Sequence, residues 1–184
     1  MIRREDAILV VVDVQEKLLP HIAEAERVIG AIEKLIDGFR IVGAPVLVTE
    51  QYRKGLGPTT ERLVVAATGG DPSGFSPIEK MTFGCVAHLP FRQALDASER
   101  RQVVLCGIEA HVCVLQTALQ LLAIGFEVFL AADATSSRDL RNVRSRFAAW
   151  RAGGGSPHLG RDGGLRDAAR ERHAGIQGLS QRIR

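Results

Sequence analysis

The stretch AILVVVDV, residues 7–14, decides the fold class. It is a continuous apolar run interrupted only by Asp13, and such a run is typical of a strand that is buried on both faces of a sheet. Apolar residues then recur at helical spacing over 25–43, with Gly43 as a stop signal. A second strand-like run, APVLVTE, follows at 44–50. The sequence therefore opens with a strand, a helix and a strand.

The same alternation continues along the chain. Strand-like runs and helical patterns follow one another in SPIEKMTF (76–83), LPFRQALDAS (89–98), QVVLCGI (102–108), HVCVLQTALQLLAIG (111–125) and FEVFLAAD (126–133). Strands that alternate with helices at this spacing form a parallel sheet with right-handed crossovers. We therefore predict an α/β fold, a single doubly wound parallel sheet with helices on both faces.

The pattern changes after Leu140. A chain of 184 residues is a natural size for one domain, and we assign residues 1–140 to it. Residues 141–184 are rich in Arg and Gly and have no run of Val, Ile or Leu that could form a sixth buried strand; a polar helix is expected near 164–173. We expect this segment of the same domain either to be poorly packed or to be read in a shifted frame. The second alternative is considered because GC-rich codons encode mainly Arg, Gly and Ala.

Charge and cysteine content limit the partners and the compartment. Of 24 basic and 21 acidic residues, 138–184 hold eleven Arg against four Asp or Glu. These arginines are scattered with almost no aromatic residues between them, so we expect no nucleic-acid partner. The N-terminal apolar run is too short for a membrane span and unlike a signal peptide. Three cysteines without a CxxC pair argue against disulfides and zinc. We expect a cytoplasmic protein that does not contact membranes.

Three residues that can carry chemistry fall at the ends of predicted strands. Asp13 ends the first strand, Lys80 ends the third, and Cys113 lies in GIEAHVCVLQTAL, at the start of the helix after the fourth. The carboxyl ends of parallel strands share one edge of the sheet, where ligands bind in open α/β folds. Each residue alone has a structural explanation, as a capping Asp, a solvated Lys or a core Cys. Their coincidence at one edge favours a site.

The three side chains suit acyl transfer without a metal. A helix N-terminus and a nearby ammonium are expected to lower the pKa of the Cys113 thiol. A carboxylate can take the thiol proton and return it to a leaving amine, and backbone amides at the helix start can hold the oxyanion. The resulting cycle passes through a thioester that water then hydrolyses.

Five motifs in order resemble the isochorismatase-like cysteine hydrolase superfamily, which includes nicotinamidases and N-carbamoylsarcosine amidases. They are DVQEKLLP, VTEQYRKGLGPT, IEKMTFGC, GIEAHVCVLQTAL and AADATSSRD, within residues 5–143. The resemblance is strongest to isochorismatase-domain proteins of unassigned substrate. It implies the strand order 3-2-1-4-5-6, an Asp13, Lys80 and Cys113 triad, a cis peptide at Ile108–Glu109, an oxyanion hole of the Glu109 and Cys113 amides, and a homo-oligomer.

Three features distinguish the chain from particular members of the family. The nicotinamidase metal motif Asp-x-His is replaced by Thr49, Glu50, Gln51 and Tyr52, so we expect no metal and no other cofactor. The presence of Cys113 favours amide-type hydrolysis over vinyl-ether hydrolysis. No sixth strand is recognisable after SSRDLRNV.

Five further residues are candidates for the substrate pocket: Gln15 and Gln51 lie just beyond predicted strands, His111 precedes Cys113 by two residues, and Tyr52 and Phe83 could form pocket walls. Cys85 and Cys106 are expected to serve in packing. Two functional interpretations remain. The first is a metal-independent amidohydrolase acting on a small molecule, and the second is a non-catalytic binding or scaffold member of the same family. The apolar helix 112–124 is a candidate oligomer interface, although core packing explains it as well.

Overall fold

The central strand of the sheet is the apolar run that opens the chain. The computed structural model describes residues 1–142 and 156–157. In it, β1 (Ala7–Val12) is buried along its whole length, as expected for a strand covered on both faces. It pairs in parallel with β2 (Val46–Gln51) on one side and with β4 (Gln102–Gly107) on the other.

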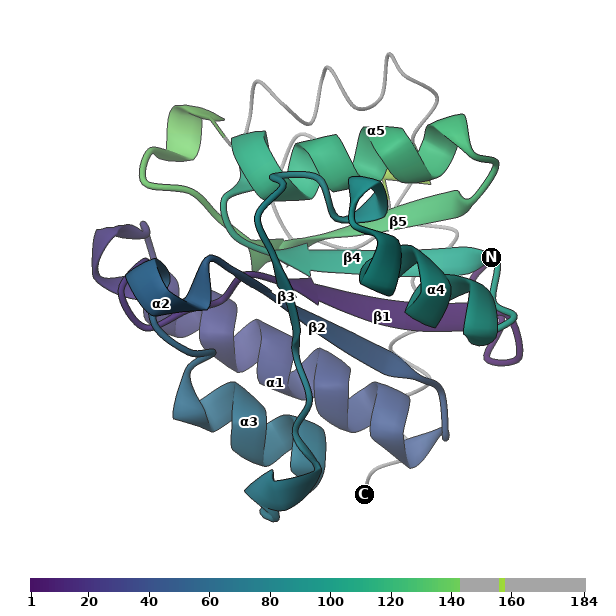
Figure 1. Cartoon of the computed structure of the whole chain (residues 1–184), viewed down its shortest axis with the longest axis horizontal. Coiled ribbons are helices and arrows are strands. Elements are labelled where there is room, and N and C mark those ends of the chain that lie inside the picture. Colours follow the sequence, from purple (N-terminus) through teal and green to yellow (C-terminus); the bar gives the residue numbers. More distant parts are fainter. Residues whose placement is uncertain (143–155, 158–184) are drawn as a thin grey trace.

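The outer strands extend the sheet on both sides. β3 (Ile78–Lys80) pairs in parallel with β2, and β5 (Glu127–Thr135) pairs in parallel with β4. The order β3-β2-β1-β4-β5 confirms the predicted single parallel sheet. Figure 1 shows the five strands between the helices that connect them.

A sixth strand adds only two residues to the sheet. β6 (Ser156–Pro157) pairs in parallel with Phe129 and Leu130 of β5. No apolar run marks this strand in the sequence, because a Ser-Pro pair has no side-chain pattern to recognise. A proline is tolerated at a sheet edge. The rest of the Arg- and Gly-rich segment, with the expected helix at 164–173, lies outside the described residues from residue 143 onward, apart from β6.

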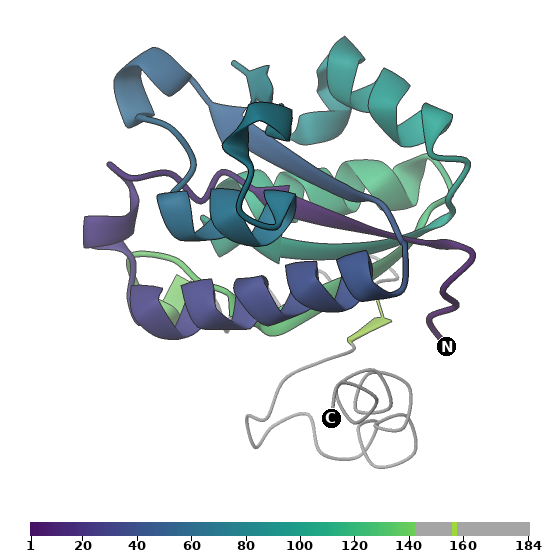
Figure 2. The same ribbon diagram turned by 90° about the horizontal axis from the view of Figure 1, so that it is seen from below.

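The sheet is covered by helices on both faces, as predicted. α1 (Ala25–Ile41) and α3 (Glu61–Thr68) lie on one face, and α4 (Leu89–Ala97) and α5 (Leu115–Ala123) lie on the other (Figure 2). This arrangement agrees with right-handed crossovers on a doubly wound sheet.

The side chains of β1 alternate between two hydrophobic cores. Leu9 and Val11 belong to the core under α1, whereas Ile8, Val10 and Val12 belong to the core under α4 and α5. Burying one such side chain contributes roughly 2 kcal/mol relative to its exposure to water. The apolar run in the sequence is therefore continuous because each face needs every second residue.

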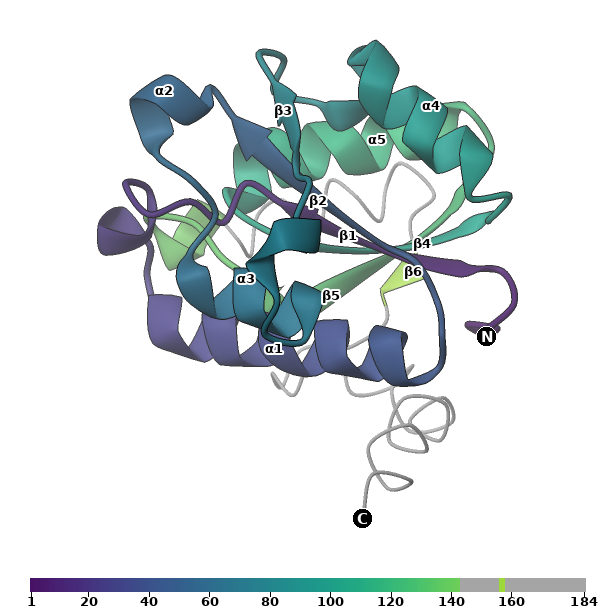
Figure 3. The same ribbon diagram turned by 60° about the horizontal axis from the view of Figure 1, so that its bottom comes forward.

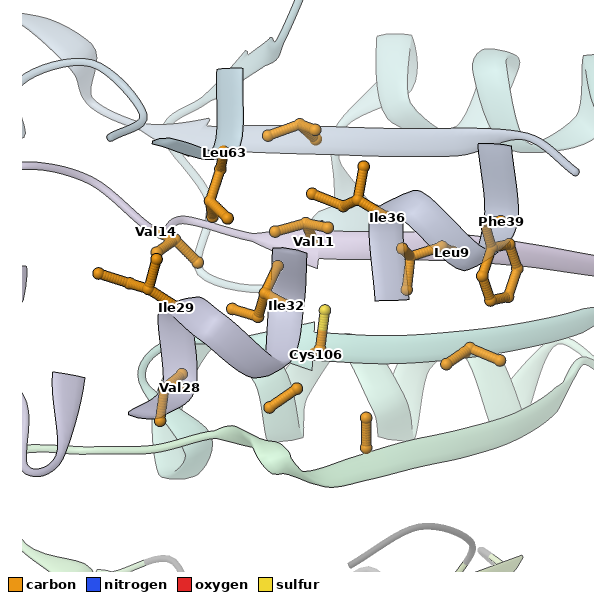
Figure 4. Packing of buried hydrophobic residues seen from close by; sticks show 14 of the residues in the cluster. Leu9, Val11, Val14, Val28, Ile29, Ile32, Ile36, Phe39, Leu63 and Cys106 are labelled. Atoms are coloured by element: carbon orange, nitrogen blue, oxygen red, sulfur yellow. The ribbon is translucent and has the colours of Figure 1, made fainter. Parts of the chain in front are cut away.

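Figure 4 shows the packing of α1 on the sheet. Ile32 and Ile36 project from the helix toward Val11 and Leu9, Ile29 lies beside Val14, and all six side chains are buried. The three- and four-residue spacing of the isoleucines places them on one side of α1. The helix therefore forms because an apolar stripe of this period can close over a strand.

Short helical turns connect the main elements. They are η1 (Leu19–His21), α2 (Arg53–Leu56), η2 (Pro72–Gly74), η3 (Cys85–Ala87) and η4 (Ala110–Val114). The sequence predicted one helix over 111–125, and this prediction is wrong at its start. The chain first forms η4, which is a π-helical turn, and α5 begins only at Leu115. Figure 3 shows α2 and the segment after β1 at the same edge of the sheet.

The end of β4 requires a glycine. Gly107 has φ 117°, and a Cβ atom at this position would lie 2.2 Å from the carbonyl oxygen of Val12. Since β1 and β4 are adjacent central strands, neither backbone can move without disturbing the other. Gly107 therefore allows the close approach of the two strands just before the chain turns into η4.

We predict that Gly107→Ala lowers the free energy of unfolding by about 3 kcal/mol, because the substitution adds both a strained φ and a backbone collision. Gly43→Ala is the matched control, since Gly43 also has a positive φ, 68°, but has no atom within 4 Å of its added Cβ. It should cost only about 1 kcal/mol. Urea denaturation of both variants measures the difference, and equal losses would contradict a role for the contact with Val12.

Candidate active site

A buried ion pair lies at the carboxyl edge of the sheet. Lys80 Nζ is 2.6 Å from Asp13 Oδ2, and both side chains are withdrawn from solvent. The residues are 67 positions apart in the sequence. They meet because Asp13 directly follows β1 and Lys80 ends β3, and these two strands lie on either side of β2.

Asp13 leaves β1 in a left-handed conformation with φ 53°. Aspartate tolerates this region better than most residues do. Its backbone N–H donates to the carbonyl oxygen of Thr49 at 3.1 Å. The turn is thus held against β2 at the residue that bears the carboxylate.

The ammonium group of Lys80 is surrounded by acceptors. Besides Asp13, it donates to Gln51 Oε1 at 2.8 Å and to the carbonyl oxygens of Thr82 and Phe83 at 3.1 and 3.2 Å. An ammonium has three N–H groups, so all of them are used inside the protein. Lys80 therefore acts on its surroundings as a fixed positive charge.

Thr49 binds the second oxygen of the carboxylate. Its hydroxyl donates to Asp13 Oδ1 at 2.7 Å, and it accepts from the Cys85 thiol at 3.9 Å. This contact of Thr49 was not predicted from the sequence, where Thr49 is only one of the residues that replace a metal motif. The available signal was a polar residue in a strand that pairs with β1, where Thr49 is in register with Val12.

The two glutamines differ in what their amides do. Gln15 is fully buried; its Nε2 donates to the carbonyl oxygens of Gln51 and Gly57, and its Oε1 accepts from the Gln51 N–H. Gln51 donates to Met81 O and accepts from Lys80. Gln15 is therefore committed to holding the backbone, and its predicted contact with a substrate is not supported by this geometry.

Cys113 lies in the π-helical turn and belongs to the apolar core under α4 and α5. Only 7% of the residue is exposed. Its carbonyl oxygen accepts from the Thr117 hydroxyl at 2.7 Å, and the same hydroxyl accepts from the Cys85 N–H at 3.0 Å. Insertions of this kind in helices are frequent at functional sites.

Burial raises the pKa of the Cys113 thiol, and the Asp13 carboxylate raises it further through its charge and a side-chain hydrogen bond. The Lys80 ammonium acts in the opposite direction but does not prevail. The sequence-based expectation of a lowered pKa is therefore wrong, because desolvation outweighs the nearby cation. Burial therefore favours the neutral thiol form of Cys113 next to the Asp13 carboxylate.

The turn that carries Cys113 is tied to the segment after β5. The predicted cis peptide at Ile108–Glu109 is present. The Glu109 carboxylate accepts from the Arg138 N–H and pairs with its Nε, both at 3.2 Å. The Ala110 N–H donates to Ser136 O at 2.8 Å. These contacts fix the backbone on which the predicted oxyanion donors, Glu109 and Cys113, are located.

The remaining candidates lie around this turn and at the end of β3. His111 is partly buried, and its Nδ1 lies 3.0 Å from the Ser137 hydroxyl. Tyr52 and Phe83 are 45% and 55% exposed, although their backbones are bound to Lys80. Both side chains are thus exposed while their backbones lie beside Lys80, and their role as pocket walls stays a prediction.

The other two cysteines are packed, as predicted. Cys106 is fully buried, its thiol contacts Val10 O at 3.7 Å, and burial raises its pKa. Burial also raises the pKa of Cys85, to about 11. All three cysteines are free thiols. Cys85 differs from Cys106 because its thiol contacts Thr49, which in turn binds Asp13.

The segment that replaces the metal motif is occupied by internal contacts. The buried Glu50 carboxylate pairs with Arg53 at 2.7 Å and accepts from the N–H and hydroxyl of Thr59. Within residues 1–142 and 156–157, no three or more His, Cys, Asp or Glu side chains are grouped so that they could hold a metal ion. The helices of this same part of the chain are all too short or too polar to cross a membrane.

Comparison with known proteins agrees with this fold. The isochorismatase domain model matches residues 7–157, and the chain therefore belongs to the isochorismatase domain family. It is 38% identical to isochorismatase domain-containing protein 2A of Mus musculus over 73% of the chain. The alignment covers 61% of the mouse protein, so the chain spans less than two thirds of that relative's length.

Two solved structures show the same architecture. The MAR1 ribonuclease of Caenorhabditis elegans is 30% identical, with a TM-score of 0.78 over 98% of this chain and 90% of its own. The YcaC protein of Escherichia coli, described as an octameric hydrolase of unknown specificity, is 22% identical, with a TM-score of 0.79 over 97% of this chain and 88% of its own. The second likeness concerns the fold alone.

The raised pKa of Cys113 predicts how the thiol reacts. Its alkylation by iodoacetamide should keep rising between about pH 7 and pH 10, because the thiolate fraction grows throughout that range. Asp13→Asn removes a charge that raises this pKa, so alkylation should become roughly tenfold faster at pH 8. Mass spectrometry of the labelled peptides measures both rates.

Cys106 is the internal control, because a fully buried thiol should stay unlabelled while the protein is folded. An alkylation rate at Cys113 that levels off near neutral pH, or one that falls in Asp13→Asn, would contradict the assigned electrostatics.

Proposed function

We propose that this chain is a cysteine hydrolase that cleaves a small amide-type substrate through a thioester on Cys113, without a metal ion. The observation that carries the proposal is the buried Lys80–Asp13 pair at 2.6 Å, with the Asp13 carboxylate in turn acting on the Cys113 thiol. A buried carboxylate next to a protonated nucleophile is the arrangement that general-base activation needs.

The first half of the cycle forms the thioester. Asp13 takes the thiol proton as Cys113 Sγ attacks the carbonyl carbon, and the carbonyl oxygen becomes an oxyanion. The backbone N–H groups of Glu109 and Cys113 donate to this oxyanion. When the intermediate collapses, the C–N bond breaks and Asp13 returns the proton to the leaving nitrogen.

The second half releases the acid. Asp13 takes a proton from water as the water oxygen attacks the thioester carbon, and the C–S bond breaks. The proton returns to the sulfur, so the free thiol is restored. Throughout the cycle Lys80 keeps the carboxylate in place and compensates its charge, since its own N–H groups are bound to protein acceptors.

The alternative of a non-catalytic binding or scaffold member is less well supported. A buried ion pair contributes little to stability, because desolvation of both charges offsets their attraction. A scaffold therefore has no need of the Asp13–Lys80 pair beside a thiol. The pair is explained when Asp13 has to accept and return a proton.

Two further properties belong to the proposal. We propose a homo-oligomer, which the exposed Leu119 and Ile124 at α5 support by offering apolar surface beyond the core, as does the octameric state described for the Escherichia coli structure. We also propose a cytoplasmic location, because three free thiols suit a reducing compartment.

We predict that Cys113→Ala lowers the rate of amide hydrolysis by at least about 10³-fold, since the thioester can no longer form. A panel of small amides and carbamoyl compounds, scored by release of ammonia, identifies a substrate. Mass spectrometry should then find an acyl group on Cys113, and added hydroxylamine should divert it to a hydroxamate. Cys106→Ala is the matched control and should retain the activity.

Hydrolysis that persists in Cys113→Ala would overturn the proposal. RNA belongs in the same panel because of the ribonuclease among the similar structures. If the protein cleaved RNA and Cys113→Ala abolished that cleavage, the proposed substrate would be a phosphodiester instead of an amide. Specific binding without turnover of any compound would favour the scaffold alternative.

A further inference from the structure

Resting on the proposed function, we propose that Thr49 is a positioning residue that acts through Asp13, by binding the carboxylate oxygen that Lys80 leaves free. Lys80 binds Oδ2 and Thr49 binds Oδ1, at 2.6 and 2.7 Å. The carboxylate is therefore held from two strands at once, β3 and β2, which fixes its plane and its distance from the π-helical turn.

The contact between Thr49 and Asp13 is made twice. The Asp13 N–H donates to the Thr49 carbonyl oxygen at 3.1 Å, and the Thr49 hydroxyl donates to Asp13 Oδ1. Thr49 is fully buried in β2, in register with Val12 of β1. The backbone bond places the turn after β1, and the hydroxyl then sets the orientation of the side chain.

Cys85 determines the direction in which the Thr49 hydroxyl donates. The Cys85 thiol donates to Thr49 Oγ1 at 3.9 Å, so the single hydrogen of the hydroxyl is left for Asp13. The Cys85 N–H is itself anchored on the Thr117 hydroxyl, which donates to Cys113 O. A continuous series of contacts thus joins the carboxylate to the backbone of the turn that bears the thiol.

The hydroxyl also spreads the charge of the carboxylate. A hydrogen bond from Thr49 withdraws negative charge from Oδ1, and losing it concentrates that charge on an oxygen in a dry environment. Because the charge of Asp13 raises the pKa of Cys113, loss of the Thr49 hydroxyl should reduce the thiolate fraction further. Thr49 therefore has a measurable effect on the sulfur without touching it.

The test is the site-resolved alkylation rate of Cys113 with iodoacetamide at about pH 8. Thr49→Val should be roughly fivefold slower than wild type, as expected for loss of one hydrogen bond to a charged group. Thr49→Ser keeps the hydroxyl and should restore the rate to within about twofold. In an Asp13→Asn background, Thr49→Val should cause no slowing, since its effect passes through the carboxylate.

Thr59→Val is the matched control. Thr59 is also a buried threonine whose hydroxyl donates to a carboxylate, Glu50 Oε1 at 2.8 Å, but that carboxylate pairs with Arg53 instead of Lys80. Its loss should leave the alkylation of Cys113 unchanged. Thermal unfolding verifies that each variant is folded. If Thr49→Val does not fold, the alkylation rate is measured in Thr49→Ala instead.

Equal alkylation rates of Cys113 in wild type and Thr49→Val would overturn the assignment. It would also be overturned if Thr49→Val slowed alkylation equally in the Asp13→Asn background, because the effect would then come from packing. These outcomes leave the proposed hydrolase intact. If instead Asp13→Asn alone fails to alter the alkylation of Cys113, the proposed partnership of Asp13 and Cys113 fails, irrespective of Thr49.

Discussion

The site depends on one constraint, the burial of two opposite charges next to a thiol. Asp13 and Lys80 are removed from solvent together, and removing either charge from water alone would cost several kcal/mol. The surrounding structure meets that cost with hydrogen bonds from Thr49 to the carboxylate and from the ammonium to Gln51 and two carbonyl oxygens. The geometry of the loops after β1, β2 and β3 follows from these requirements.

The same low-dielectric environment determines the state of the sulfur. In water a nearby ammonium would favour a thiolate. Here burial opposes ionisation of the thiol, and the Asp13 carboxylate raises the thiol pKa by more than the Lys80 ammonium lowers it. In the proposed mechanism Cys113 is therefore a neutral nucleophile, and Asp13 is its base. A neutral thiol reacts slowly with oxidants and alkylating agents, and it becomes a thiolate only when a base accepts its proton.

The sequence predicted much of this fold because its signals are local. β1, α1 and β5 are long apolar or amphipathic runs, and their alternation determines a parallel sheet. The two-residue β6 has no such signal, and its pairing depends on backbone contacts with Phe129 and Leu130. The π-helical turn was missed because the apolar residues of 110–114 are compatible with either helix type.

The proximity of Asp13, Lys80 and Cys113 was predictable, but the energetics of the proposed site were not. Asp13, Lys80 and Cys113 could be found from their positions at strand ends and from the family resemblance. The balance between burial and the ammonium could not, because it depends on how completely Cys113 is enclosed. The hydrogen bond of Thr49 to Asp13 and those of Gln15 to the backbone could not be predicted either. They depend on which groups lie opposite these residues across strands and loops.

The contacts between η4 and the segment after β5 have a consequence for any shortened form of the chain. Ser136, Ser137 and Arg138 supply the partners of Ala110, His111 and Glu109. A fragment that stopped at the end of β5 would keep β1 to β5 and all three residues of the proposed triad, yet the turn that carries its thiol would lose these contacts. The shortest fragment that keeps the contacts of η4 therefore extends beyond the end of β5.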